Sequence, residues 1–170
     1  MIRLVGAALL IAGCGGLGLG AVSRLDGRVR DLRELAAGLE LLRRELGWRL
    51  TPLPEALSAA EQGAQGHAAQ FFRFCAQRAG CLSGIPFQQL WREGLEQCPL
   101  RLDQEDRVLL EQLGPVLGRY DGDSQCQAVD KALAGLARQQ AQAEENRRRL
   151  GRVYGVLGVT GGLFLAILLI

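Results

Sequence analysis

The sequence contains a single histidine, His67, and lacks the residue patterns that most enzymes use for chemistry. No Ser–His–acid or Cys–His set, HExxH motif, phosphate-binding loop or metal-ligand spacing is present. The five cysteines are an odd number and form neither a CxxC pair nor a Cys/His cluster, which argues against a disulfide framework. We therefore expect no enzyme activity, no cofactor and no metal. His67 is expected at the surface or in a helix cap.

Lysine is almost absent as well, because Lys131 is the only lysine among 20 basic residues. The 18 acidic residues nearly balance these, and a net charge of +2 is too small to suggest nucleic-acid binding as the main task. The alternating pattern of β-strands is also missing, since apolar residues recur at steps of three and four. These absences predict an all-α fold and partners other than nucleic acid.

Charged residues are missing from two long stretches near the ends of the chain, 4–23 and 153–170. Each stretch approaches the roughly 20 apolar residues that a helix needs to cross about 30 Å of hydrocarbon. We therefore predict a transmembrane helix at 1–23, a soluble domain at 24–150 and a second transmembrane helix at 151–170. The domain would be an antiparallel bundle of about six helices between the two membrane helices.

Arginines cluster on the domain side of both predicted spans, and positive charge next to a span tends to stay in the cytoplasm. Only Arg3 lies on the other side of the first span. The arginines on the domain side are Arg24, Arg28, Arg30, Arg33, Arg147, Arg148, Arg149 and Arg152. The domain is therefore predicted to be cytoplasmic, in a protein of the cell membrane.

The first predicted span also contains a signal for a different anchor. Residues 11–14, Ile-Ala-Gly-Cys, fit the box that precedes the lipid-modified cysteine of bacterial lipoproteins. With Cys14 lipidated, the protein would be an extracytoplasmic, lipid-anchored helical adaptor. A processed lipoprotein normally continues into a polar tether, whereas residues 15–22 stay apolar and charge begins only at Arg24. The transmembrane interpretation is therefore favoured.

A long amphipathic helix opens the domain, and turn residues follow it. Its apolar face comprises Leu25, Val29, Leu32, Leu35, Leu39, Leu42 and Leu46. Gly47 is expected to end this helix in a left-handed conformation, and Thr51 to cap the next short helix. Pro52 and Pro54 suit the first turn of that helix, where a missing N–H costs little.

Further helices are predicted at 67–77, 86–97, 103–117 and from Ser124 onward. Asp103 opens the third of these, with Asp106 three residues later as an acidic capping partner. The buried face of the 103–117 helix is expected to comprise Val108, Leu109, Leu113, Val116 and Leu117. The phenylalanines at 71, 72, 74 and 87 are expected to supply much of the domain core.

Two groups of residues are candidates for contacts beyond the bundle. The segment 139–149 of the last helix is polar on all sides, which predicts that it stands free or faces a partner. The candidate partner interface comprises Gln139, Gln142, Glu145, Arg147 and Arg148. Glycines four residues apart in the predicted spans would let membrane helices approach closely. These candidates for membrane-helix packing are Gly16, Gly20, Gly158 and Gly162.

Several short motifs occur in an order that resembles a known family. They are the opening Met1-Ile2-Arg3-Leu4, then Glu45-Leu46-Gly47-Trp48 with Thr51-Pro52-Leu53-Pro54, then Leu113-Gly114 and Leu117-Gly118-Arg119, and finally Leu150-Gly151 before the apolar tail. Over its whole length the chain resembles the stage III sporulation protein AB family of endospore-forming bacteria. Trp48 departs from the family pattern, in which tyrosine is expected.

The resemblance implies a fold and a role. The soluble domain of that family is similar to the helical-bundle domains of the inner-membrane platform protein of type II secretion and type IV pilus systems. The protein would then be a structural, non-enzymatic subunit of the channel complex between mother cell and forespore, in the mother-cell membrane that faces the forespore. Its implied partners are other subunits of that complex, including a cytoplasmic secretion-type ATPase, and it is compatible with an oligomer.

Overall fold

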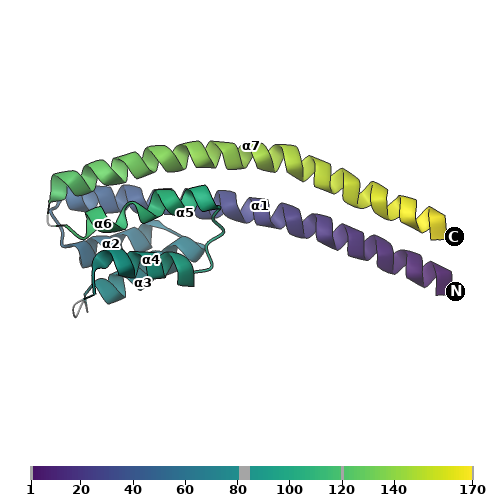
Figure 1. Ribbon diagram of the computed structural model, residues 1–170, viewed down its shortest axis with the longest axis horizontal. Helices are drawn as coiled ribbons and strands as arrows, with labels where there is room; N and C mark the ends of the chain where they lie inside the picture. Colours follow the sequence, from purple (N-terminus) through teal and green to yellow (C-terminus); the bar gives the residue numbers. More distant parts are fainter. Residues whose placement is uncertain (1, 81–84, 120, 170) are drawn as a thin grey trace. The chain divides into compact units, whose positions relative to one another are not determined.

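The computed structural model describes the backbone of residues 2–80, 85–119 and 121–169, and the side chains of residues 20, 23–80, 85–119, 121–150 and 160. The described backbone forms helices and no strand, which confirms the all-α prediction. The helices are α1 (Ile2–Trp48), α2 (Leu53–Gly63), α3 (Gly66–Ala79), α4 (Phe87–Gln97), α5 (Gln104–Glu111), α6 (Gly114–Leu117) and α7 (Gly122–Leu169) (Figure 1).

Contacts within the chain define two compact units. One comprises residues 1–29 and 142–170, which are the outer parts of α1 and α7. In this unit Arg147 of α7 forms an ion pair with Asp26 of α1. The other unit comprises residues 30–141 and contains the short helices α2 to α6 with the inner parts of α1 and α7.

None of the helices in the described part of the chain combines the length and the apolar character that crossing a membrane requires. The predicted spans at 1–23 and 151–170 fall almost entirely outside the residues whose side chains the structure describes. Both spans therefore stay predictions.

The core of the 30–141 unit is built around α1, whose buried face matches the predicted one. Leu32, Leu35, Leu39, Leu42 and Leu46 are all at most 5% exposed. The rings of Phe71 and Phe72 in α3 pack edge-on, with their centroids 5.3 Å apart. The Phe71 ring also packs edge-on against Trp91 of α4, at a centroid distance of 4.7 Å. Phe87 is also buried, whereas Phe74 is half-buried. The predicted aromatic core is therefore confirmed in its main members.

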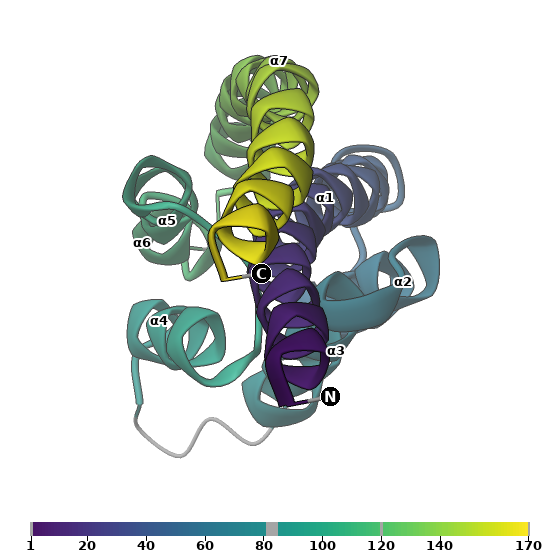
Figure 2. The same cartoon turned by 90° about the vertical axis from the view of Figure 1, so that its right-hand side faces the viewer.

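Glycines lie where the short helices pack closely on the two long ones. α2 and α3 lie beside α1, and α5 and α6 lie beside α7, with α4 next to α3 and α6 (Figure 2). A Cβ added at Gly63 of α2 would lie 2.9 Å from Leu41 of α1. At Gly135 of α7 it would lie 2.7 Å from Leu109 of α5. Glycine therefore sets how closely these helices approach.

The connection between α1 and α2 differs from the prediction in two details. Gly47 lies inside α1, where an added Cβ would be 3.1 Å from the Cys126 sulfur of α7. Its role is therefore to let α1 and α7 approach closely. Leu50 adopts the left-handed conformation instead, with φ of 51°. Thr51 does not cap α2: its N–H donates to the Glu45 carbonyl at 3.2 Å and its hydroxyl to the Glu45 carboxylate at 3.1 Å.

Helix α5 begins as predicted, because Asp103 and Asp106 form a reciprocal capping box. The buried face expected for 103–117 is partly wrong. Leu110 is fully buried although it was not expected there, and Val108 is 45% exposed. The buried residues Asp106, Leu110, Leu113 and Leu117 recur at steps of four, three and four, so they share one helical face. The predicted face was placed at the wrong phase of this period.

Candidate protein-interaction site

The predicted interface on α7 has more intrachain contacts than its sequence suggests. Ala143, within the segment 139–149, is 3% exposed, so the segment has a buried side. The Gln139 amide donates a hydrogen bond to the Glu105 carboxylate of α5 at 3.0 Å. Arg147 is engaged by Asp26. Two of the five predicted residues therefore already have roles within the chain.

The remaining three residues of that predicted interface are exposed. Gln142, Glu145 and Arg148 lie in the unit formed by residues 1–29 and 142–170, whereas Gln139 belongs to the 30–141 unit. Their contact with a partner stays a prediction.

The glycines predicted to pack membrane helices are mostly beyond what the structure describes. The surroundings of Gly16, Gly158 and Gly162 lie outside the described residues. Gly20 is exposed, and among the described residues a Cβ added there would meet no heavy atom within 4 Å. Its packing role stays a prediction.

A buried carboxylate of α1 explains the position of the single histidine. Asp31 is 4% exposed, and its Oδ2 accepts a hydrogen bond from the Arg101 N–H at 2.8 Å and lies 3.2 Å from His67 Nδ1. One turn later, Glu34 accepts a hydrogen bond from the Gln65 N–H at 2.9 Å. His67 lies at the start of α3, as predicted. The contact with Asp31 gives His67 a structural role that the sequence pattern did not indicate.

The described cysteines, Cys75, Cys98 and Cys126, are free thiols. Burial raises the pKa of the Cys75, Cys98 and Cys126 thiols above the ordinary value. A protonated thiol is a poor nucleophile and a poor metal ligand at neutral pH. Within the described ranges, no group of three His, Cys, Asp or Glu side chains is placed to hold a metal ion. Cys14 and Cys81 lie outside the described residues.

Two large apolar side chains are exposed where α1 meets α2. Trp48 is 83% exposed and Leu50 is 80% exposed. We call this feature the Trp48–Leu50 ridge. Isolated apolar residues on a surface are common, but a tryptophan and a leucine two residues apart, both this exposed, are typical of a contact site.

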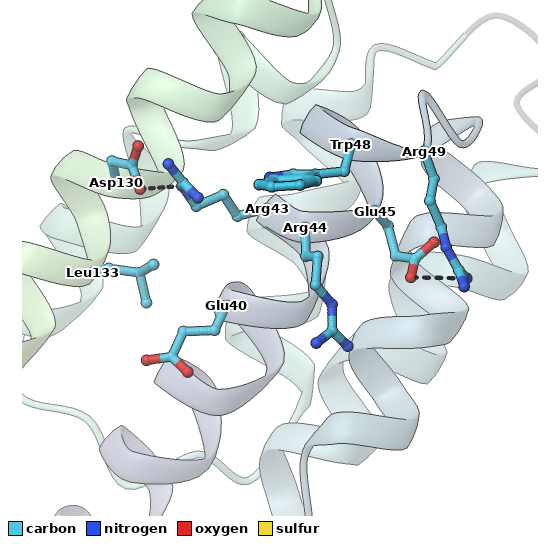
Figure 3. Close-up of a pocket in the computed structure, with 8 residues that line it drawn as sticks. All are labelled: Glu40, Arg43, Arg44, Glu45, Trp48, Arg49, Asp130 and Leu133. Carbon is cyan, nitrogen blue, oxygen red and sulfur yellow. Dashed lines mark hydrogen bonds and ion pairs between the residues drawn. The ribbon is translucent and has the colours of Figure 1, made fainter.

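Trp48 borders an open groove of about 890 Å³ between α1 and α7 (Figure 3). Arg43 forms an ion pair with Asp130 of α7, and the hydrogen bond and charge of Asp130 raise the pKa of Arg43 above its ordinary value. Arg49 pairs with Glu45 at 3.3 Å. Charged residues therefore make up most of its lining, with two ion pairs formed within the chain, and we call it the polar groove.

Leu50 borders a second groove of about 620 Å³, which is more apolar. Its lining includes Leu46, Pro52, Phe87, Leu117 and Arg119. Gln125 of α7 fixes one edge, because its amide donates to the main-chain carbonyls of Leu117, at 2.8 Å, and Arg119. The ridge thus has a polar groove at Trp48 and an apolar groove at Leu50.

The sequence prediction missed this ridge because the segment 47–54 reads as a turn. The available signal was the presence of Trp48 and Leu50 among the turn residues, since a turn alone needs no large apolar side chain. The turn is closed by Thr51, which donates two hydrogen bonds to Glu45, and these bonds are not evident from the sequence.

An all-α domain with an exposed apolar ridge defines a helical domain suited to contacts with other proteins. The sequence model of the family "Stage III sporulation protein AB" matches residues 3–170. The chain therefore belongs to the stage III sporulation protein AB family.

Two relatives agree with this assignment. The chain is 29% identical over 172 aligned residues to stage III sporulation protein AB of Bacillus subtilis (strain 168), with 99% of each sequence covered. A solved structure of a stage III sporulation protein AB is 26% identical and superposes with a TM-score of 0.65, over 72% of this chain and 98% of that one. The resemblance noted in the sequence motifs is thereby confirmed.

Proposed function

We propose that this protein is a non-enzymatic scaffold subunit of the sporulation channel complex between mother cell and forespore. Membership of the stage III sporulation protein AB family supports the sporulation role. The scaffold role is supported by the Trp48–Leu50 ridge, because two exposed apolar side chains suit contact with a protein surface. In this proposal the protein works by holding other subunits together.

The proposal includes anchoring in the mother-cell membrane through helices at 1–23 and 151–170, with the domain in the cytoplasm. Its support is the uncharged stretches at both ends and the arginines on the domain side of each. The alternative is an extracytoplasmic adaptor with a lipid on Cys14.

Cys126 is a reporter for this topology, since its side chain is partly exposed whereas Cys75 is buried. A membrane-impermeant maleimide added to intact cells at mildly alkaline pH should leave Cys126 unlabelled, because we propose that the domain faces the cytoplasm. Permeabilisation should then allow labelling, which peptide mass spectrometry assigns to the residue. Cys75 serves as the control, with labelling expected only in denaturant. Labelling of Cys126 in intact cells would favour the lipid-anchored adaptor.

We further propose that the cytoplasmic domain binds a secretion-type ATPase, and that exposed residues of α7 contribute. Arg148→Glu is a sharper test than Arg147→Glu, because Arg147 also pairs with Asp26. Reversing the charge of Arg148 should weaken binding of the full-length protein to the purified ATPase by about tenfold. Surface plasmon resonance measures this change.

A matched control is available in α4. Arg92 is an exposed arginine that pairs with Glu96 at 3.1 Å, and Arg92→Glu should leave ATPase binding unchanged. Equal affinities for the wild type and Arg148→Glu would exclude Arg148 from the contact.

A further inference from the structure

We propose that the Trp48–Leu50 ridge is the docking site for an amphipathic helix of the ATPase, one that carries carboxylates beside its apolar face. This inference rests on the proposed function, because it assumes the cytoplasmic partner named there. It assigns to that partner a contact site in the 30–141 unit and a chemistry for the segment that fills it.

The turn holds Leu50 in an outward position at a cost. Leucine rarely adopts a positive φ, and Leu50 has a φ of 51° while its side chain is 80% exposed. Burial within this chain therefore does not offset the backbone strain. The conformation is maintained by Thr51, which donates two hydrogen bonds to Glu45, and by the pairing of Glu45 with Arg49. Strain maintained in this way is typical of binding sites.

Two exposed apolar side chains, each beside a groove, suit a partner with two apolar anchors. Trp48 stands beside the polar groove of about 890 Å³, and Leu50 beside the apolar groove of about 620 Å³. Tryptophan is enriched among the residues that dominate binding energy at interfaces. An amphipathic helix places apolar side chains at i and i+3 or i+4, and one could enter the apolar groove while another covers Trp48.

The charge around the ridge favours an acidic partner. The arginines bordering the two grooves beside it include Arg44, Arg49 and Arg119. The carboxylates of Glu45 and Asp130 are already held in ion pairs with Arg49 and Arg43. Glu40 is the other acidic residue that lines the polar groove, two turns before Trp48 on α1. Carboxylates next to the apolar face of the partner would meet Arg44 and Arg119, because Arg43 and Arg49 are engaged by Asp130 and Glu45.

The test is the affinity of the full-length protein, purified in detergent, for the purified secretion-type ATPase. The double variant Trp48→Ala/Leu50→Ala should bind at least about 30-fold more weakly, as expected for the loss of central anchors. Ile85→Ala/Val108→Ala is the matched control, because Ile85 and Val108 are also exposed apolar residues, at 49% and 45%. The control should bind like the wild type. Circular dichroism melting should show that both double variants keep the fold.

A second variant tests whether the partner helix carries carboxylates. Arg44→Glu/Arg119→Glu should weaken binding about tenfold at low ionic strength, and the remaining affinity should depend less on salt than that of the wild type. An unchanged affinity and salt dependence would overturn the acidic character that we assign to the partner helix.

The outcomes separate this inference from the proposed function. If the wild type binds the ATPase and the ridge variant binds equally well, the ridge is not the docking site, although the ATPase contact stands. If the wild type does not bind, the ATPase contact fails and the ridge assignment fails with it. Light scattering covers the remaining occupant: a wild-type dimer that Trp48→Ala/Leu50→Ala converts to a monomer would identify a second copy and overturn the proposal.

Discussion

Trp91→Ala is expected to lower the free energy of unfolding of the full-length protein by about 4 kcal/mol. Trp91 is fully buried and packs edge-on against Phe71, at a distance of 4.7 Å between ring centroids. The Phe87 ring lies on it at a tilt, with the centroids 5.8 Å apart. Its indole N–H donates to the Leu110 carbonyl at 2.8 Å, so truncation leaves a cavity and removes this buried hydrogen bond, although the Leu113 N–H still donates to the same carbonyl. For a domain with a stability of about 5–15 kcal/mol, this loss is large.

The measurement is urea denaturation followed by circular dichroism, which does not depend on tryptophan fluorescence. The other tryptophan is a matched control, because Trp48 is 83% exposed and Trp48→Ala should change stability by about 0.5 kcal/mol or less. Trp91→Phe should fall between the two, since it keeps most of the ring volume and loses the hydrogen bond. Equal losses for Trp91→Ala and Trp48→Ala would contradict the described core.

Gly38→Ala is expected to destabilise the fold by about 2 kcal/mol, although alanine is the better helix former. Replacing glycine by alanine inside a helix normally adds about 1 kcal/mol of stability. At Gly38, however, a Cβ would clash with Cε2 of Phe72 and lie 2.8 Å from its Cζ. Phe72 is fully buried and packs against Phe71, so its ring has little room to move. Overpacking of about 3 kcal/mol therefore outweighs the helical gain.

Gly80→Ala is the control for this prediction, and Phe72→Leu tests whether the Phe72 ring causes the loss of stability. Gly80 ends α3 with a helical φ of −72°, and a Cβ there would meet no heavy atom within 4 Å, so Gly80→Ala should be close to neutral. Phe72→Leu should cost less in the Gly38→Ala background than in the wild type, because the smaller side chain relieves the clash. Additive losses in the same urea experiment would show that Gly38 and Phe72 do not press on each other.

The helices could be predicted from the sequence because their signals are local. The leucine row of α1 follows the helical period, and the capping box of α5 lies within four consecutive residues, Asp103 to Asp106. The prediction failed where a contact from elsewhere in the chain changes the outcome. Gly47 stays helical where α1 approaches Cys126, and no periodic pattern shows this effect. Leu110 was missed for a different reason: it follows the helical period of Asp106, Leu113 and Leu117, and the predicted face was placed at another phase.

The candidate site divides in the same way. The interface residues of α7 were predicted from their polarity alone. In the structure, however, Arg147 forms an ion pair with Asp26, and Gln139 donates a hydrogen bond to Glu105. The Trp48–Leu50 ridge could not be predicted, since residues in a turn are expected at the surface for reasons of backbone polarity.

Residue identity and spacing within short segments were enough to predict the all-α class, the apolar face of α1, the aromatic core and the family to which the chain belongs. Only the tertiary structure decided that Asp31 is buried under His67 and Arg101, and that Leu50 points outward at a positive φ. Such outcomes depend on which distant groups satisfy each other's hydrogen bonds, and that balance is settled only when the helices pack together.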